Sequence, residues 1–320
     1  MLKLVPLAVC LALGSAVSAY GHTSDGKPCP PVEDIDIRAE LEETIGLPVL
    51  HDDEIDPDMI TIGCKDRFCF AHNSESKAPV WVAEKMTRAI ACGDNKRPSG
   101  WKAEDVGGLP RATNEDYTHS GYARGHNAAS DDFKSSRDWM KQTFTFANSV
   151  PQIQDGFNGS YWRFLEEDVK HLALSGHDIY VITGPIPLAD DGKPFSIEPA
   201  GQSCRNEVPI AGKDDLKQPS ICGGTKADGP NQDCQAGVDV PAGMFKIIYL
   251  VKYNRLFAYA ASNIDHRPLG KKFSHHDDYI ETWRVSVRDI EELTNLEFFP
   301  ELDKRQMEVA KNSCITTPKH

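Results

Sequence analysis

Four side chains in two short stretches of the sequence have the types that hydrolysis of a phosphate ester requires: Arg124, His126, Asn158 and Glu166. The imidazole of His126 can take a proton from water near neutral pH. Arg124 offers a rigid, permanently charged fork that fits a phosphate. Asn158 supplies a hard carbonyl oxygen of the kind that Mg2+ accepts, and Glu166 can orient waters on the same ion. These residues predict a one-metal site that cleaves phosphodiesters.

A helix is needed to bring the second pair of residues to the site. Apolar residues recur there at spacings of three and four, which predicts a helix with one buried side: Trp162, Leu165, Val169 and Leu172. On such a helix Asn158 and Glu166 would lie about 80° apart around the axis, at roughly 100° per residue. They would then address one cleft from successive turns.

Strands are expected on both sides of this helix. Runs rich in β-branched and aromatic residues predict them at 59–63, 68–71, 80–83, 143–146, 178–183, 244–252 and 256–261. The stretch 92–117 is rich in Gly and Pro, which predicts a long loop leading to the site. A short helix is expected at 287–293. The mixture predicts an α+β fold with a central, mostly antiparallel sheet flanked by helices.

The N-terminus has the pattern of an export signal. Residues 1–19 combine Lys3, an apolar run and a small-residue cleavage site that ends at Ala19. The apolar run is shorter than the roughly 20 residues that span a bilayer. We therefore expect cleavage near Ala19 and a secreted or periplasmic product that does not remain in the membrane. Residues 20–56 are acidic and Pro-rich and are expected to form an extension. By length alone, the rest of the mature chain could form either one domain or two.

The chain has nine cysteines, and loss of Cys10 with the signal would leave eight. An even number in an exported protein favours disulfides. A local bridge between Cys64 and Cys69 is plausible, as is one between two of Cys204, Cys222 and Cys234. The last three lie in a segment at about 187–241 that is expected to be a Cys-rich insertion between two core strands. The complete connectivity stays open at this point.

The formal net charge of -13 argues against a broad basic surface. A polyanionic substrate would need a local cationic cleft that works against the overall field. Binding should then be modest and strongly salt-dependent.

The site segments, together with six further blocks in order, resemble the DNA/RNA non-specific endonucleases of the ββα-metal, or His-Me finger, class. The signature of that family is Asp-Arg-Gly-His followed by Asn and Glu on a helix. The further blocks lie at 81–85, 116–117, 146–152, 180–185, 240–246 and 289–300, and the likeness covers roughly residues 75–302.

This resemblance implies a single domain over residues 57–320 with a ββα-metal fold. It also implies a Mg2+-dependent enzyme, with Mn2+ as a possible replacement, that cuts both DNA and RNA. It assigns His126 as general base, Asn158 as metal ligand, Glu166 as the residue that holds metal-bound water, and Arg124 as the residue that stabilises negative charge. Lys170 lies where the family often has Arg, and it would contact phosphate as a point charge.

Arg97 loosely matches an upstream Arg of the family that contacts phosphate. One position departs from the family signature, since Ala123 replaces the Asp before Arg-Gly-His. With the acidic charge balance, this motivates an alternative function: a catalytically impaired nuclease-fold protein that binds nucleic acid or another polyanion. A narrower phosphodiesterase that acts on small nucleotides is a third possibility.

The sequence 158–160 also matches an N-glycosylation sequon, and a glycan on Asn158 would exclude the metal. DNA versus RNA preference and oligomeric state stay open.

Overall fold

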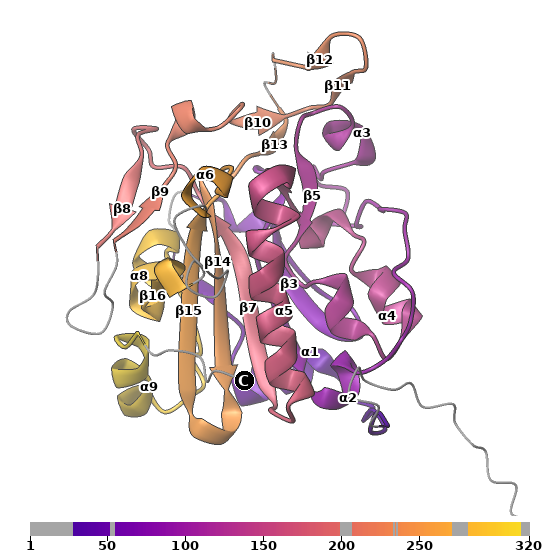
Figure 1. The fold of residues 1–320 in the computed structure, drawn as a ribbon, viewed down its shortest axis with the longest axis vertical. Helices are drawn as coiled ribbons and strands as arrows, with labels where there is room; N and C mark the ends of the chain where they lie inside the picture. The colour runs from indigo at the N-terminus through magenta and orange to yellow at the C-terminus, as the bar shows by residue number, and fades with distance from the viewer. Residues whose placement is uncertain are drawn as a thin grey trace, which may run out of the picture.

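The computed structural model describes residues 28–51, 55–198, 207–232, 234, 236–270 and 281–314. A seven-stranded sheet with the order β16-β15-β14-β7-β4-β3-β2 forms its centre, and every neighbouring pair is antiparallel (Figure 1). Its strands are β2 (Ile60–Cys64), β3 (Phe68–Asn73), β4 (Ala78–Met86), β7 (Ile179–Ile186), β14 (Gly243–Leu250), β15 (Arg255–Ser262) and β16 (Arg284–Val285).

The long helix α5 (Tyr161–Leu174) packs along one face of this sheet (Figure 1). Its buried residues include Trp162, Leu165, Val169 and Leu172, as the spacing predicted. They belong to one core cluster with sheet residues such as Val181. The apolar side of α5 therefore fixes how the helix lies on the sheet.

The opposite face of the sheet carries a second core. It is covered by α1 (Ile37–Thr44), α8 (Val287–Thr294) and α9 (Lys304–Lys311), whose buried side chains join a cluster with Trp81 and Phe245. Helices thus cover both faces of an antiparallel sheet, and the predicted α+β class is confirmed.

The N-terminal segment is more integrated than an extension would be. Helix α1 buries Ile37 and Leu41 against the sheet, and β1 (Val49–Leu50) pairs with β17 (Leu296–Glu297) near the other end of the chain. A disulfide from Cys29 to Cys92 links the start of the described chain to the body. The described part of the predicted extension therefore packs against the body of the fold.

A two-stranded hairpin lies beside the main sheet. It is formed by β5 (Ala123–His126) and β6 (Ser149–Gln152), and the connection between them contains the turn η2 (Ser130–Phe133) and the helix α4 (Arg137–Gln142). The strand predicted at 143–146 is wrong, because Thr143 caps α4 and strand β6 begins at Ser149.

The reason for this error is the proline within β6. Pro151 removes a backbone donor and weakens the strand pattern, but β6 has a partner on one side only, where proline is tolerated. The loop predicted at 92–117 is confirmed up to α3 (Asn114–Tyr117), the short helix that ends it.

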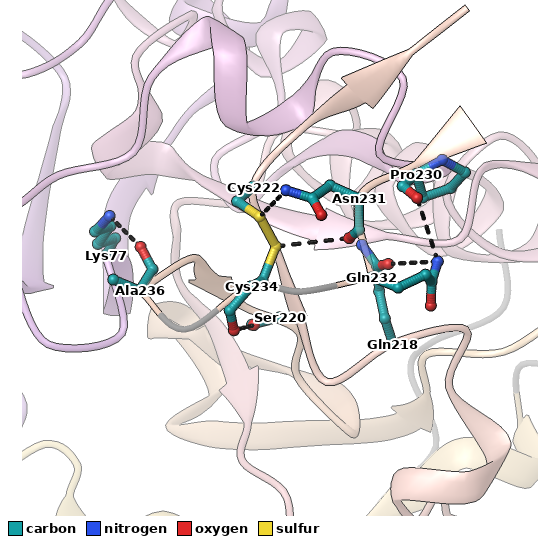
Figure 2. The surroundings of a disulfide bond; sticks show 9 residues. All are labelled: Lys77, Gln218, Ser220, Cys222, Pro230, Asn231, Gln232, Cys234 and Ala236. Carbon is teal, nitrogen blue, oxygen red and sulfur yellow. Dashed lines mark hydrogen bonds between the residues drawn. A yellow bond between two sulfur atoms is a disulfide. The ribbon is translucent and has the colours of Figure 1, made fainter. Parts of the chain in front are cut away.

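In the predicted Cys-rich insertion between β7 and β14, the strands that the structure describes are short. They are β8 (Phe195–Ile197), β9 (Val208–Ile210), β10 (Ser220–Ile221), β11 (Gly224–Thr225), β12 (Gly229–Pro230) and β13 (Val238–Asp239). Figure 2 shows the bridge from Cys222 to Cys234 within it, one of the predicted pairs. Here Lys77, from the turn before β4, donates to the carbonyl of Ala236 over 2.6 Å.

The predicted bridge between Cys64 and Cys69 is also present, and Cys314 is disulfide-bonded. In the part of the chain that the structure describes, no helix is long and apolar enough to cross a membrane. The export signal at 1–19 and Cys204 lie outside the described residues.

We expect the bridge from Cys29 to Cys92 to stabilise the fold more than the one from Cys64 to Cys69. It closes a loop over a sequence separation of 63 rather than 5, and the chain-entropy relation gives about 4 against about 2 kcal/mol. Urea unfolding of the two double Cys→Ser variants would measure the difference. An equal loss of unfolding free energy in both variants would contradict this prediction.

Candidate active site

The β5–β6 hairpin places Arg124 and His126 on the same face of one strand, because successive strand residues point to opposite sides. The register pairs His126 with Ser149 and Ala123 with Gln152. Gly125 between them is required by space, since a Cβ there would lie 2.2 Å from the Oε1 atom of the Gln152 side chain.

His126 sits in an aromatic pocket. Its ring centroid lies 4.6 Å from that of Trp101 and 4.9 Å from that of Phe144, and the residue is 6% exposed. The Nε2 atom has no hydrogen-bond partner among the described residues. Burial, followed by the charge of Arg97, lowers the pKa of His126 to about 3. The imidazole is therefore neutral and can accept a proton.

Arg97 reaches the site from the long loop. Its guanidinium lies 5.1 Å from the ring centroid of Phe144, the same ring that contacts His126. Its charge also lowers the pKa of Glu166. The residue that matched the family only loosely is thus next to two of the predicted site residues, and its exposed position suits an anion.

Arg124 is held in place from α3. Its Nη2 atom donates to the backbone oxygen of Asn114 over 3.2 Å and to the side-chain oxygen over 2.8 Å. The guanidinium also lies 5.4 Å from the ring centroid of Tyr117. These contacts occupy the Nη2 atom and orient the guanidinium.

Asn158 does not lie on the helix, which begins at Tyr161; this part of the prediction is wrong. It ends the irregular turn η4 (Gln154–Asn158), in which Gly156 has a φ of +83°. The 80° relation to Glu166 therefore does not hold. Turn η4 nevertheless contacts β5, the strand that carries His126. The side-chain Nδ2 of Asn158 donates to Gln154 over 3.0 Å, which leaves its oxygen for a cation.

Two residues that the sequence reasoning missed fix this turn. Buried Asn263 accepts from the amide of Ile153 and donates to the carbonyls of Pro151 and Pro241. Gly156 has no room for a side chain, since a Cβ would lie 1.8 Å from Asp265. The glycine could have been noticed in the sequence, whereas the role of Asn263 depends on contacts between distant segments.

Glu166 lies on α5 among charged groups. Partial burial raises its pKa to about 8, the charges of Lys246 and Arg97 lower it, and Asp132 and Glu167 raise it. The charges of Lys246 and Arg97 therefore favour the ionised carboxylate of Glu166 against the effect of burial.

Lys170, one turn further along α5, forms an ion pair with Asp131. Its ammonium is thus engaged within the protein rather than free for phosphate. Asp131 also pairs with Lys134 over 3.0 Å, which shows that this aspartate balances local positive charge.

The donors fit a magnesium ion that keeps most of its water. Within the described residues, no group of three or more His, Cys, Asp or Glu side chains could hold a metal. Asn158 offers one amide oxygen, and Glu166 is a carboxylate that can accept hydrogen bonds from waters. Mg2+ commonly retains several waters and uses one or two protein ligands, so this sparse donor set agrees with it better than with a metal that needs a protein cage.

Comparison with known proteins identifies the family of the chain. The sequence pattern described as DNA/RNA non-specific endonuclease matches residues 60–305. The mitochondrial nuclease EXOG of Danio rerio is 29% identical over 256 residues, which are 77% of this chain and 64% of that protein. Nuclease C1 of Cunninghamella echinulata var. echinulata is 27% identical over 243 residues, 75% of this chain and 82% of its own. The chain thus spans slightly under two thirds of the EXOG relative.

A solved structure described as the EndoG/EndoGI complex, in which EndoG is inhibited, has a similar fold. The TM-score is 0.60 at 22% identity, and the match covers 86% of this chain and 96% of that chain. The ββα-metal nuclease fold is thereby confirmed.

We expect the ring of His126 to stay neutral from pH 8 to pH 5. The unfolded chain would bind the proton near pH 6.5 and the folded chain only near 3. The contribution of His126 to stability is therefore lost as the pH falls from about 6.5 toward 3. An NMR titration of the ring carbon shifts would measure the pKa, and Arg97→Gln should raise it. A midpoint near 6.5 in the folded protein would contradict this description.

Proposed function

Because the chain belongs to the DNA/RNA non-specific endonuclease family, we propose that it is a Mg2+-dependent endonuclease that hydrolyses phosphodiester bonds in both DNA and RNA, with His126 as general base. One observation carries the proposal: β5, the strand that contacts the turn ending at Asn158, carries a buried, neutral imidazole on which the charge of Arg97 acts and whose Nε2 has no hydrogen-bond partner among the described residues.

In this reaction His126 accepts the proton of the attacking water. Its low pKa makes it a weak base in the free protein, and the positive charge of Arg97 is one of the two causes. A substrate phosphate bound to Arg97 would offset that charge and raise the basicity of the imidazole. Arg97 then couples the binding of substrate to the activation of His126 as a base.

The remaining groups bind the phosphate and the cofactor. Arg124, oriented by Asn114, and Arg97 would contact the non-bridging oxygens and stabilise the charge that develops on them. Asn158 would bind Mg2+ directly, and Glu166 would hold its waters. When bound, the ion supplies Lewis acidity and stabilises the departing oxygen.

We also propose export, followed by removal of residues 1–19 near Ala19, with action in a secreted or periplasmic compartment. The disulfides support this assignment, because such bridges persist mainly in oxidising compartments. An unmodified peptide mass for residues 158–160 in the exported protein would support the metal assignment of Asn158, whereas a glycan there would exclude it.

The variant His126→Ala should cut turnover on plasmid DNA and on RNA by about 10²–10⁴-fold. The affinity for Mg2+ should stay unchanged, since imidazole is not proposed as a ligand. Digestion with and without EDTA measures the reaction, and His177→Ala, beyond the end of α5, is a matched control that should keep full activity.

Binding of nucleic acid without cleavage by the wild type in Mg2+ would favour the alternative, an impaired polyanion-binding protein. Cleavage of dinucleotides but not of long duplex would instead favour the narrower phosphodiesterase.

The variant Asn158→Ala should behave differently, because it removes the proposed protein oxygen on the ion. We expect a weaker Mg2+ affinity in calorimetry and partial recovery of activity at high Mg2+. Asn312→Ala, an exposed asparagine after α9, serves as control. Full activity of Asn158→Ala at low Mg2+ would show that this asparagine is merely structural.

A further inference from the structure

A small polar cluster interrupts the apolar face of the sheet beneath α5. Side chains that point to this face alternate along each strand, and most are apolar, such as Val181 and Ile248 in the core cluster. The face instead carries Thr183 on β7 beside its register partner Lys246 on β14. Glu84 on β4 lies two residues along from Val82, the β4 partner of Thr183. All three are at most 2% exposed.

Lys246 is the centre of this cluster. Its register partner on β7 is Thr183, and its Nζ atom donates to the Thr183 hydroxyl over 2.7 Å. The ammonium also lies 5.6 Å from the ring centroid of Trp162 on α5. Because Glu166 follows Trp162 by four positions, it lies one turn further along the same side of the helix. The buried charge therefore lies under the part of α5 that carries Glu166.

The charges around Lys246 come from three different elements. Its ammonium interacts with Glu84 on β4, with Asp132 in η2 and with Glu166 on α5, and it favours the ionised form of each carboxyl. One cation thus faces three carboxyl groups, one of whose oxygens, Oε2 of Glu84, is buried without a hydrogen-bond partner among the described residues.

Such a cluster is not required for stability. Taking a charge out of water costs several kcal/mol, and replacing buried ionic groups by apolar ones is often neutral or stabilising. Strongly perturbed charges of this kind occur preferentially at functional sites. The position of the cluster, under one carboxylate of the site, indicates which residue it serves.

We propose that Lys246 is a positioning residue for the hydrolytic reaction: its ammonium attracts the carboxylate of Glu166 from below and holds it where it can orient the waters of the metal ion. This inference rests on the proposed function of Glu166. Arg97, the other cation that acts on Glu166, lies on an exposed loop and would be shared with the substrate, so Lys246 is the permanent partner.

The test is a double-mutant cycle with Lys246→Met and Glu166→Gln. Lys246→Met should lower kcat by about 10- to 100-fold, as loss of a group that orients metal-bound ligands commonly does, with little change in KM for nucleic acid. In the Glu166→Gln background the same change should have no further effect. Lys246→Arg, which keeps the charge, should retain more activity than Lys246→Met.

A second measurement does not depend on catalysis. Calorimetry without nucleic acid should show that Lys246→Met weakens the affinity for Mn2+ by about 10- to 100-fold while the Tm stays the same or rises. Lys311→Met is the matched control, because Lys311 is also buried but pairs with Glu291 at the far side of the sheet. It should leave both Mn2+ affinity and kcat unchanged.

The outcomes separate this inference from the proposed function. If His126→Ala abolishes cleavage while Lys246→Met keeps wild-type kcat and Mn2+ affinity, the enzyme assignment stands and the role of Lys246 is wrong. If the wild type does not cleave but Lys246→Met still loses Mn2+, the positioning role stands without the activity. Should Lys246→Met fail to fold, Thr183→Val, which removes the hydroxyl that holds Nζ, must lower Mn2+ affinity; an unchanged affinity would overturn the proposal.

Discussion

The packing of α5 on the antiparallel sheet is the constraint on which the site depends. Trp162, Leu165 and Val169 are buried against the strands, and this burial fixes both the height and the rotation of the helix. Glu166 is therefore held above the sheet level of Lys246. The start of α5 is fixed as well, so that the preceding turn with Asn158 must lie against β5. The proposed catalytic groups are thus placed by an apolar interface that takes no part in the chemistry.

The same arrangement explains why an acidic protein can have a site for a polyanion. The net charge is -13, yet Arg97, Arg124 and Lys246 lie at or beneath one small region, while Lys170 is neutralised by Asp131. Aromatic rings exclude water around His126 and strengthen the effect of each charge there. The local field is thus set by a few cations in a dry environment rather than by the surface as a whole.

Sequence reasoning predicted the features that have a local physical cause. The period of α5, the strands of the main sheet other than β16, and the bridge between Cys64 and Cys69 follow from spacing and residue type. It failed where the cause is tertiary. Asn158 was expected on the helix, but Gly156 and the clamp from Asn263 impose a turn before it. Nothing local distinguishes Lys246 from an ordinary strand lysine, because its importance depends on which helix covers it.

The central claim is that the β5–β6 hairpin and the start of α5 form one metal-dependent site around His126 and Asn158. Crystals soaked in Mn2+ would test it most directly through the anomalous scattering of the ion. The account predicts one strong peak at about 2.1 Å from the side-chain oxygen of Asn158, with water as the remaining ligands and no direct bond to His126. A peak coordinated instead by Asp131 and Asp132, or by the ring of His126, would contradict it.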